Sequence, residues 1–319
     1  MNQNSSYHLR PFDASRDLQP VADLIEQCFA QTLDPDGQRF VRRMRTAAQD
    51  KGLAKLAAIS PDWAGLPLNG YVCEADGQVV GNASLLTYFA NNQRNFLIAN
   101  VAVRPEYRRK GIARALTMKV LEHARKWGAS SVWLHVREEN EAALSLYQSL
   151  GFVEHDHRTT WFSNPVHPPE AKLSGLAILP PDKACWAEQQ TWLAHNYPAD
   201  LRWSLSFNPK LLNPGIQGAL LRLFNNADIN QWAALTNDRL AAVLSWQAMP
   251  SHADALWLAA PVGADEGSLH ALLAYVRLRL PASRTLKLEY PARQSEQAIR
   301  EAGFTPHQTL IWMSTSLRK

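Results

Sequence analysis

The spacing of apolar residues divides the first half of the chain into helices and strands. Apolar side chains recur at helical spacing from 13 to 32, which predicts a helix with one buried face. Two strand-like runs joined by Asp76-Gly77 predict a hairpin. The pattern predicts a strand at 7–12, helices at 13–32 and 36–50, a loop at 52–70 and strands at 71–75, 78–90 and 95–103. A helix from 112 onward, a strand at 130–136, a helix at 138–152 and a strand at 157–162 follow.

The stretch 101–116 combines the end of a strand, a basic turn and the start of a helix. Its apolar alternation is followed by three cations at 108–110, then by Gly111 and a helical period from Ile112. The first turn of a helix has backbone N–H groups without intrahelical partners and carries positive dipole, so it attracts anions. Gly111 lets an anion approach the main chain, and Ala113 keeps the next side chain small. The pattern predicts a phosphate-binding loop.

This loop and the helix at 138–152 resemble the two signature motifs of the GNAT (Gcn5-related N-acetyltransferase) superfamily. The family's pyrophosphate loop reads Q/R-x-x-G-x-G/A, and residues 108–113 read R-R-K-G-I-A. A second family motif, N-x-x-A-x-x-x-Y-x-x-x-G-F, matches at Asn140, Ala143, Tyr147, Gly151 and Phe152. The resemblance implies acetyl-CoA as acyl donor, bound by Val101, Ala102, Val103, Arg108, Arg109, Lys110, Gly111, Ile112, Ala113, Arg114 and Asn140.

The resemblance also implies a catalytic acid. Tyr147 matches the family's general acid, and its unperturbed pKa of about 10 suits protonation of a departing thiolate; alternatively its ring only packs on the sheet. Asn140 either contacts the coenzyme arm or only begins its helix. The strand before the phosphate loop lacks the glutamate that some family members carry there. Glu74, Glu106, His135 and ordered water remain candidates for the general base, and none is assigned.

The second half of the chain repeats the order of the first. Where residues 108–113 carry cations, residues 264–269 read A-D-E-G-S-L, so carboxylates would oppose a phosphate. The alternative is that the second half is an unrelated α+β domain and not a repeat of the first. We predict an α+β protein of two GNAT-like domains, each a mostly antiparallel twisted sheet flanked by helices. The expected parts are a catalytic domain at 1–163, a proline-rich linker at 164–170 and a degenerate domain at 171–319.

Composition narrows the class of protein. The 319 residues are 46% hydrophobic and 19% charged, which is typical of a globular chain. Residues 1–165 carry 19 basic and 17 acidic side chains and residues 166–319 carry 14 and 12, a balance that disfavours a nucleic-acid binder. The 3 cysteines lack metal-ligand spacing, and no apolar run approaches the roughly 18 residues of a membrane span. We expect a cytoplasmic protein with no metal and no membrane partner.

These observations favour transfer of an acetyl group from acetyl-CoA to the primary amine of a small molecule. The protein would act as a monomer or homodimer. Two alternatives stay open, a non-catalytic acyl-CoA sensor and an acetyltransferase that acts on a protein N-terminus or lysine. Neither the acceptor nor the acyl chain length is specified by the residues of the two motifs.

Overall fold

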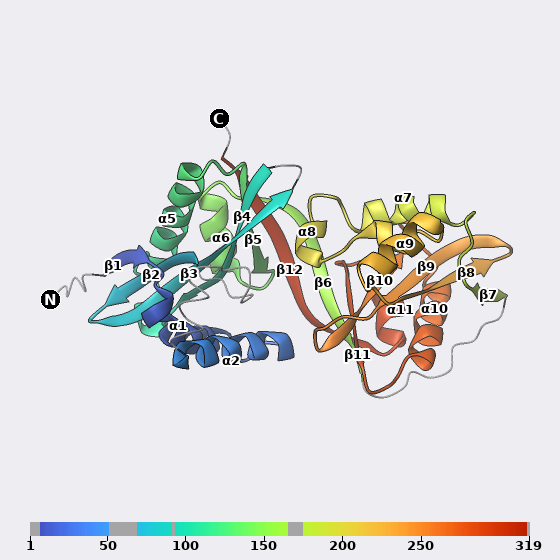
Figure 1. Ribbon diagram of the computed structural model, residues 1–319, viewed down its shortest axis with the longest axis horizontal. Coiled ribbons are helices and arrows are strands. Elements are labelled where there is room, and N and C mark those ends of the chain that lie inside the picture. Colours follow the sequence, from blue (N-terminus) through green and yellow to red (C-terminus); the bar gives the residue numbers. More distant parts are fainter. Residues whose placement is uncertain (1–6, 51–68, 91–92, 165–174, 318–319) are drawn as a thin grey trace. The chain divides into compact units, whose positions relative to one another are not determined.

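The chain folds as two compact units (Figure 1). The computed structural model describes residues 7–50, 69–90, 93–164 and 175–317. The first unit contains the chain up to His155 together with Trp312–Lys319, and the second contains Asp156–Ile311. Nearly all of the predicted loop at 52–70 and of the predicted linker at 164–170 lies outside the described residues.

The first unit follows the predicted order of elements. Its hairpin turns at Asp76 and Gly77, whose φ angles of 51° and 73° are the left-handed values that a tight hairpin turn requires. The elements are β1 (His8–Pro11), α1 (Ala14–Phe29), α2 (Pro35–Gln49), β2 (Asn69–Ala75), β3 (Gln78–Ala90), β4 (Gln93–Val103), the 3-10 helix η1 (Pro105–Tyr107), α5 (Ile112–Lys126), β5 (Ser131–Arg137) and α6 (Glu141–Ser149).

Helices cover both faces of the first sheet. Helices α1 and α2 lie on one face and α5 and α6 on the other (Figure 1). Asp13 caps α1, and the apolar stripe of that helix, including Val21 and Ile25, packs with Val72 of β2 and Ala102 of β4. The predicted amphipathic helix is therefore confirmed, and its buried face fixes one side of β4.

The first sheet is mostly antiparallel, as predicted. Its strand order is β1-β2-β3-β4-β5-β12, where β12 is Phe304–Ser316, with β1 to β4 antiparallel and β4 parallel to β5. The parallel pairing joins Asn95–Ile98 to Ser131–Leu134, although both strands continue beyond it. The two strands thus leave a stretch of main chain without partners in this ladder.

The second unit repeats this architecture. Its order is β6-β11-β10-β9-β8-β7, where β6 is Val153–Ser163; the pair β10 and β11 is parallel and the other described pairings are antiparallel. The elements are β7 (Leu176–Leu179), α7 (Trp186–Asn196), α8 (Arg202–Leu205), the 3-10 helix η2 (Pro209–Leu212), α9 (Ile216–Phe224), β8 (Ile229–Thr236), β9 (Arg239–Gln247), β10 (Ala253–Ala259), α10 (Glu266–Arg279), β11 (Thr285–Pro291) and α11 (Glu296–Glu301).

The last strand of each half differs most from expectation. Strand β6 (Val153–Ser163) begins earlier than the predicted 157–162, and only its residues up to His155 belong to the first unit. Strand β12 (Phe304–Ser316) likewise divides after Ile311. The compact units therefore do not follow the proposed 1–163 and 171–319 boundaries, because each takes residues from the last strand of the other half. Sequence periodicity identifies a strand but not the sheet that it joins.

Candidate active site in the first unit

The predicted phosphate loop is open at the start of α5. Gly111 is the N-cap of α5 with φ of 80°, and no side chain caps the helix there. A Cβ built on Gly111 would meet only the Tyr7 hydroxyl, at 4.0 Å. The α-helical pattern leaves the first N–H groups of α5 without backbone acceptors. The loop thus offers amide donors and space for an anion's oxygens, which suits a pyrophosphate.

Four exposed cations surround this helix start. Arg108 donates from Nε to the Val103 carbonyl at 3.1 Å, Arg114 donates to the Ser149 hydroxyl at 2.8 Å, and Lys110 lies 4.7 Å from the centre of the Tyr107 ring. In the described part of the chain, Arg109 makes no hydrogen bond or ion pair, and none of the four pairs with a carboxylate. Their positive charge is therefore not neutralised by neighbouring acids.

The same contacts bring the two motifs together. Arg114 stands in the first turn of α5 and Ser149 is the last residue of α6, so their 2.8 Å hydrogen bond ties the two helices at the phosphate loop. Asn140 is the N-cap of α6, and its side-chain oxygen accepts from the Ala143 N–H at 3.1 Å. The capping interpretation of Asn140 is confirmed, while its amide nitrogen retains donors for another partner.

Strand β4 contains a β-bulge just before the phosphate loop. Asn100 has φ of 52°, and β4 has one residue more than β3 at this point. Buried Asn82 donates to the Asn100 carbonyl at 3.0 Å and so holds the bulge. Val101 lies past the end of the β4–β5 ladder and has no partner in it, whereas the Val103 carbonyl already accepts from Arg108. Neither asparagine was singled out from the sequence; the only available signal was asparagine's tolerance of left-handed backbone.

Tyr147 lies buried on α6. Its side chain is only 6% exposed and meets the Phe152 ring edge-on at 5.8 Å between centres. The hydroxyl makes no hydrogen bond to any described residue. Burial raises the pKa of Tyr147 to about 12, because an ionised phenolate would lose its hydration. The phenol is thus a protonated donor with no protein acceptor in the described structure.

The candidates for the general base are placed differently. Glu74 accepts from Arg10 at 2.8 Å, and this hydrogen bond holds the pKa of Glu74 below its usual value, so Glu74 is a structural ion-pair partner. Glu106 is exposed in η1, 4.0 Å from Arg104. His135 follows the last β4-paired residue of β5 and stacks on Trp312 at 4.5 Å. The geometry therefore argues against Glu74 as the general base, and it assigns that role to neither Glu106 nor His135.

The corresponding region of the second unit is closed. Asp265 caps α10 and accepts from the Ser268 N–H at 2.7 Å, and Glu266 accepts from the Ala298 N–H of α11 at 2.8 Å. Gly267, which aligns with Gly111, lies inside the helix and lacks the left-handed backbone. Acidic side chains thus occupy the start of α10, whereas the start of α5 is uncapped.

Side chains also fill the space beside β10. The pairing of β10 with β11 stops after Leu256 and Leu288, as that of β4 with β5 stops after Ile98 and Leu134. Beyond that point, the Leu258 N–H donates to the Tyr197 hydroxyl at 3.1 Å. The Ala260 N–H donates to the Asn196 side chain at 3.1 Å. Main-chain groups that a ligand could use are thus occupied by α7 and the residue after it.

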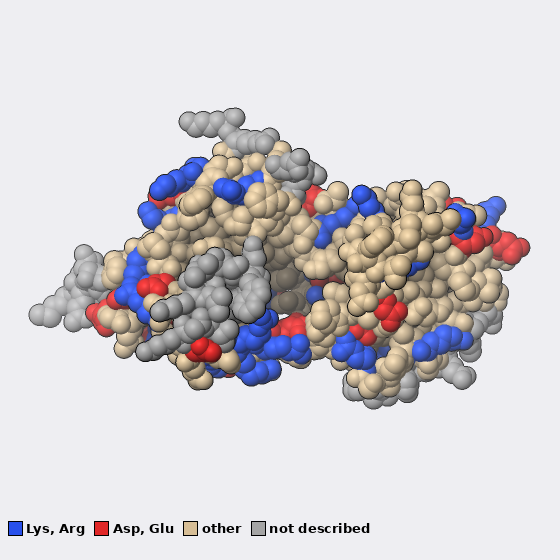
Figure 2. Space-filling view, in the orientation of Figure 1, with Lys and Arg blue, Asp and Glu red and all other residues tan. Residues whose placement is uncertain are grey.

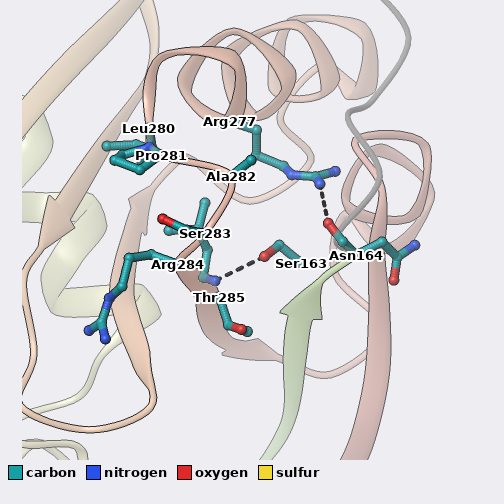
Figure 3. A pocket seen from close by; sticks show the side chains of 10 residues that line it. Ser163, Asn164, Arg277, Leu280, Pro281, Ala282, Ser283, Arg284 and Thr285 are labelled. Atoms are coloured by element: carbon teal, nitrogen blue, oxygen red, sulfur yellow. Dashed lines mark hydrogen bonds between the residues drawn. The ribbon is translucent and has the colours of Figure 1, made fainter.

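A cavity of about 280 Å³ opens elsewhere in the second unit, between the ends of β6 and α10 and the start of β11 (Figure 3). Arg277 donates to the Asn164 carbonyl at 2.6 Å, and the Ser163 hydroxyl accepts from the Leu286 N–H at 2.9 Å. These bonds fasten the end of β6 to its neighbours. No predicted site residue lines this cavity, so it is separate from the candidate active site.

The described residues hold no group of three or more side chains arranged to bind a metal. Among the described helices, none combines the length and apolar character needed to cross a membrane. On the face visible in Figure 2, basic side chains of the described residues alternate with acidic and neutral ones instead of forming one continuous basic surface.

Comparison with known proteins agrees with the two motifs. Residues 37–152 match the model of the Acetyltransferase (GNAT) family. A stretch of 79 residues, 25% of this chain, is 38% identical to the ribosomal protein bS18-alanine N-acetyltransferase of Escherichia coli (strain K12), and covers 53% of it. The chain thus matches about half the length of that relative.

Among the solved structures that resemble the chain over nearly its whole length are two with a TM-score above 0.5. A GCN5-related N-acetyltransferase from Sphaerobacter thermophilus has a TM-score of 0.58 at 17% identity, over 98% of this chain and 96% of that one. A GCN5-related glucosamine N-acetyltransferase region of a fungal multi-domain GH3 beta-N-acetylglucosaminidase has a TM-score of 0.59 at 12% identity, over 98% of this chain and 38% of that one. At such identities the likeness shows the fold alone, and it extends through the second unit.

Proposed function

We propose that the protein is an acetyl-CoA-dependent N-acetyltransferase whose acceptor is the primary amine of a small molecule, because residues 37–152 match the model of the Acetyltransferase (GNAT) family. One observation carries the proposal. The helix start at Gly111 is uncapped and surrounded by unneutralised cations, and it is tied to the helix that holds the buried phenol of Tyr147.

The first step is recognition of the donor. Amide groups at the start of α5 would bind the pyrophosphate, and Arg108, Arg109, Lys110 and Arg114 would offset its charge. The main chain of β4 at Val101–Val103 would bind the pantetheine arm and orient the thioester, since the ladder with β5 has already ended. Acetyl-CoA supplies the activated acyl group.

The second step is acyl transfer. The amine nitrogen attacks the thioester carbonyl carbon, so a C–N bond forms and the C–S bond breaks. One proton leaves the amine for ordered water, which we propose as the base because no carboxylate is assigned. Tyr147 gives its proton to the departing thiolate sulfur, and solvent then reprotonates the phenolate. The raised pKa of Tyr147 keeps this proton in place at neutral pH.

A second candidate is acetylation of a protein amine. It is favoured by the 38% identity to an enzyme named for an alanine of ribosomal protein bS18. The shared 79 residues cover only 25% of this chain and 53% of that enzyme, so the likeness does not identify the acceptor. A peptide with an N-terminal alanine is therefore included as an acceptor in the test.

The test is release of free thiol from acetyl-CoA, measured with full-length protein across small amines, amino acids and peptides. We expect acceptor-dependent thiol release and an N-acetylated product of the matching mass. Binding of acetyl-CoA without turnover of any acceptor would instead support an acyl-CoA sensor. Turnover of peptides alone would replace the small-molecule acceptor by a protein amine.

A further inference from the structure

Arg137 is a cation at the end of β5 that the proposed reaction does not use. It stands three residues after Leu134, where the pairing with β4 ends. Strand alternation places it on the same face as His135 and Trp133. Its guanidinium reaches the connection between α1 and α2, where it donates to the Thr32 carbonyl at 3.5 Å. The charge therefore lies beside the diverging strands, on the α1 face of the sheet.

The charge of Arg137 is poorly compensated. The side chain is half-buried, and in the described part of the chain its only hydrogen bond is the long one to Thr32. Two other shielded arginines, Arg10 and Arg158, each form an ion pair, with Asp17 at 2.6 Å and with Asp156 at 3.0 Å, and buried Arg277 donates to three main-chain carbonyls. Arg137 has no such pair among described residues, and a guanidinium has five N–H donors to satisfy.

Burial also disfavours the charged form of the Arg137 guanidinium. Desolvation lowers the pKa of Arg137, and nearby Glu139 opposes that change. Glu139 is exposed and forms no ion pair with it within 4.0 Å, so water screens their attraction. A partly desolvated cation of this kind is stabilised by an anion that binds it directly.

The phosphates of the coenzyme are not the natural anion for this arginine. The proposed phosphate loop begins α5, and α5 covers the opposite face of the sheet from α1 and α2 (Figure 1). An amine acceptor must reach the thioester where β4 and β5 diverge, which is where Arg137 stands. A carboxylate on the acceptor would match the planar guanidinium through two parallel hydrogen bonds.

We infer that Arg137 binds a carboxylate of the acceptor, so that the acceptor is an amino acid or a closely related molecule carrying both an amine and a carboxylate. This inference rests on the proposed function. The bonds made and broken are those of acyl transfer to the amine, and the carboxylate remains unchanged. Arg137 would thus select and orient the acceptor while Tyr147 serves the leaving thiolate.

The experiment compares each of the common amino acids with its carboxamide, using acetyl-CoA and full-length protein. The amide keeps the amine and removes the negative charge. For the preferred acceptor, we expect kcat/KM to be about tenfold to hundredfold higher for the acid than for the amide, the range of charge-assisted hydrogen bonds. Arg137→Met should remove that preference mainly by raising KM for the acid, with the KM of acetyl-CoA unchanged.

Two further variants keep the result interpretable. Arg137→Lys retains the positive charge but lacks the two parallel N–H donors of the guanidinium, so it should recover part of the preference for the acid over the amide. Arg125→Met, at an exposed arginine near the end of α5, should leave the preference intact. Circular dichroism and the melting temperature establish that each variant is folded.

The outcomes separate this inference from the proposed function. Equal acetylation of acid and amide, or an unchanged preference in folded Arg137→Met, overturns the carboxylate site and leaves the acetyltransferase proposal standing. Turnover of no amine at all overturns both.

Discussion

The two units build nearly the same frame around opposite chemistry. In each, a parallel strand pair stays in register for four residues and then separates, at Asn95–Ile98 with Ser131–Leu134 and at Ala253–Leu256 with Thr285–Leu288. In the first unit the next helix starts uncapped among cations. In the second it starts with Asp265 as cap, and the Tyr197 hydroxyl accepts from the Leu258 N–H of the neighbouring strand β10. The frame depends on buried apolar residues, so it persists although the residues at the start of the helix differ between the two units.

In the second unit, side chains satisfy the main-chain donors where β10 and β11 separate. A diverging strand pair exposes main-chain donors, and leaving a buried donor unpaired costs about 1–3 kcal/mol. Tyr197 and Asn196 supply acceptors for the N–H groups of Leu258 and Ala260. In the first unit no such side chain reaches Val101 from the described residues, and we propose that substrate takes this role.

Removing the Tyr147 hydroxyl should have the largest effect. Tyr147→Phe is expected to lower kcat by roughly 10²–10⁴-fold, the usual contribution of a general acid. The melting temperature should hardly change, because the hydroxyl bonds to no described residue. Steady-state kinetics and calorimetric melting measure both quantities. A folded Tyr147→Phe enzyme with full kcat would show that the phenol only packs on the sheet.

Closing the phosphate loop should have the next largest effect. In Gly111→Val, a branched side chain at φ of 80° strains the backbone and fills the space where the pyrophosphate would lie. We expect KM for acetyl-CoA to rise by about 100-fold. Gly267→Val is the matched control, because its helical backbone accepts a side chain and its unit has no open loop. Equal effects of the two substitutions would remove the distinction between the units.

Opening the second unit should change stability but not catalysis. Tyr197→Phe deletes the acceptor of the buried Leu258 N–H, and is expected to lower the free energy of unfolding by about 1–3 kcal/mol. Denaturant unfolding measures the loss, and thiol release should retain its wild-type kcat. A large loss of kcat in a protein that remains folded would indicate that the second unit takes part in the reaction.

A single loop cation should contribute less. Arg109→Gln removes a charge that makes no hydrogen bond or ion pair with a described residue, so the fold should not change. We expect a roughly threefold to tenfold rise in KM for acetyl-CoA, shrinking as salt screens the remaining charges. Kinetics at low and high ionic strength measure the effect. A KM unaffected by the substitution at low salt would place the phosphates away from Arg109.

The smallest effect concerns pH. A general acid acts while protonated, and burial moves the pKa of Tyr147 from 10.0 to about 12. The alkaline loss of kcat that Tyr147 sets should therefore begin only as pH approaches 12, above the range in which an exposed tyrosine would ionise. A pH profile of kcat up to about pH 10 should show no fall from this group. A fall with an apparent pKa below 10 that Tyr147→Phe abolishes would contradict the assignment.

The sequence predicted the order of elements well because burial imposes periodicity. The loop at Gly111 and the cap at Asn140 were accessible because they depend on neighbours close in sequence. The bulge at Asn100 was not, since it is defined by register with β3, and neither was the contact of Tyr197 with Leu258, 61 residues away. Helices α8 and α9 were also not predicted; the proline- and glycine-containing stretch around them weakens any periodic signal.

The most direct test of the comparison is the stoichiometry of coenzyme A binding to the full-length protein, measured by isothermal titration calorimetry. We predict about one molecule per chain, with binding lost in Gly111→Val and retained in Gly267→Val. Two molecules per chain, or undiminished binding by folded Gly111→Val, would contradict the claim that the first unit alone holds the donor.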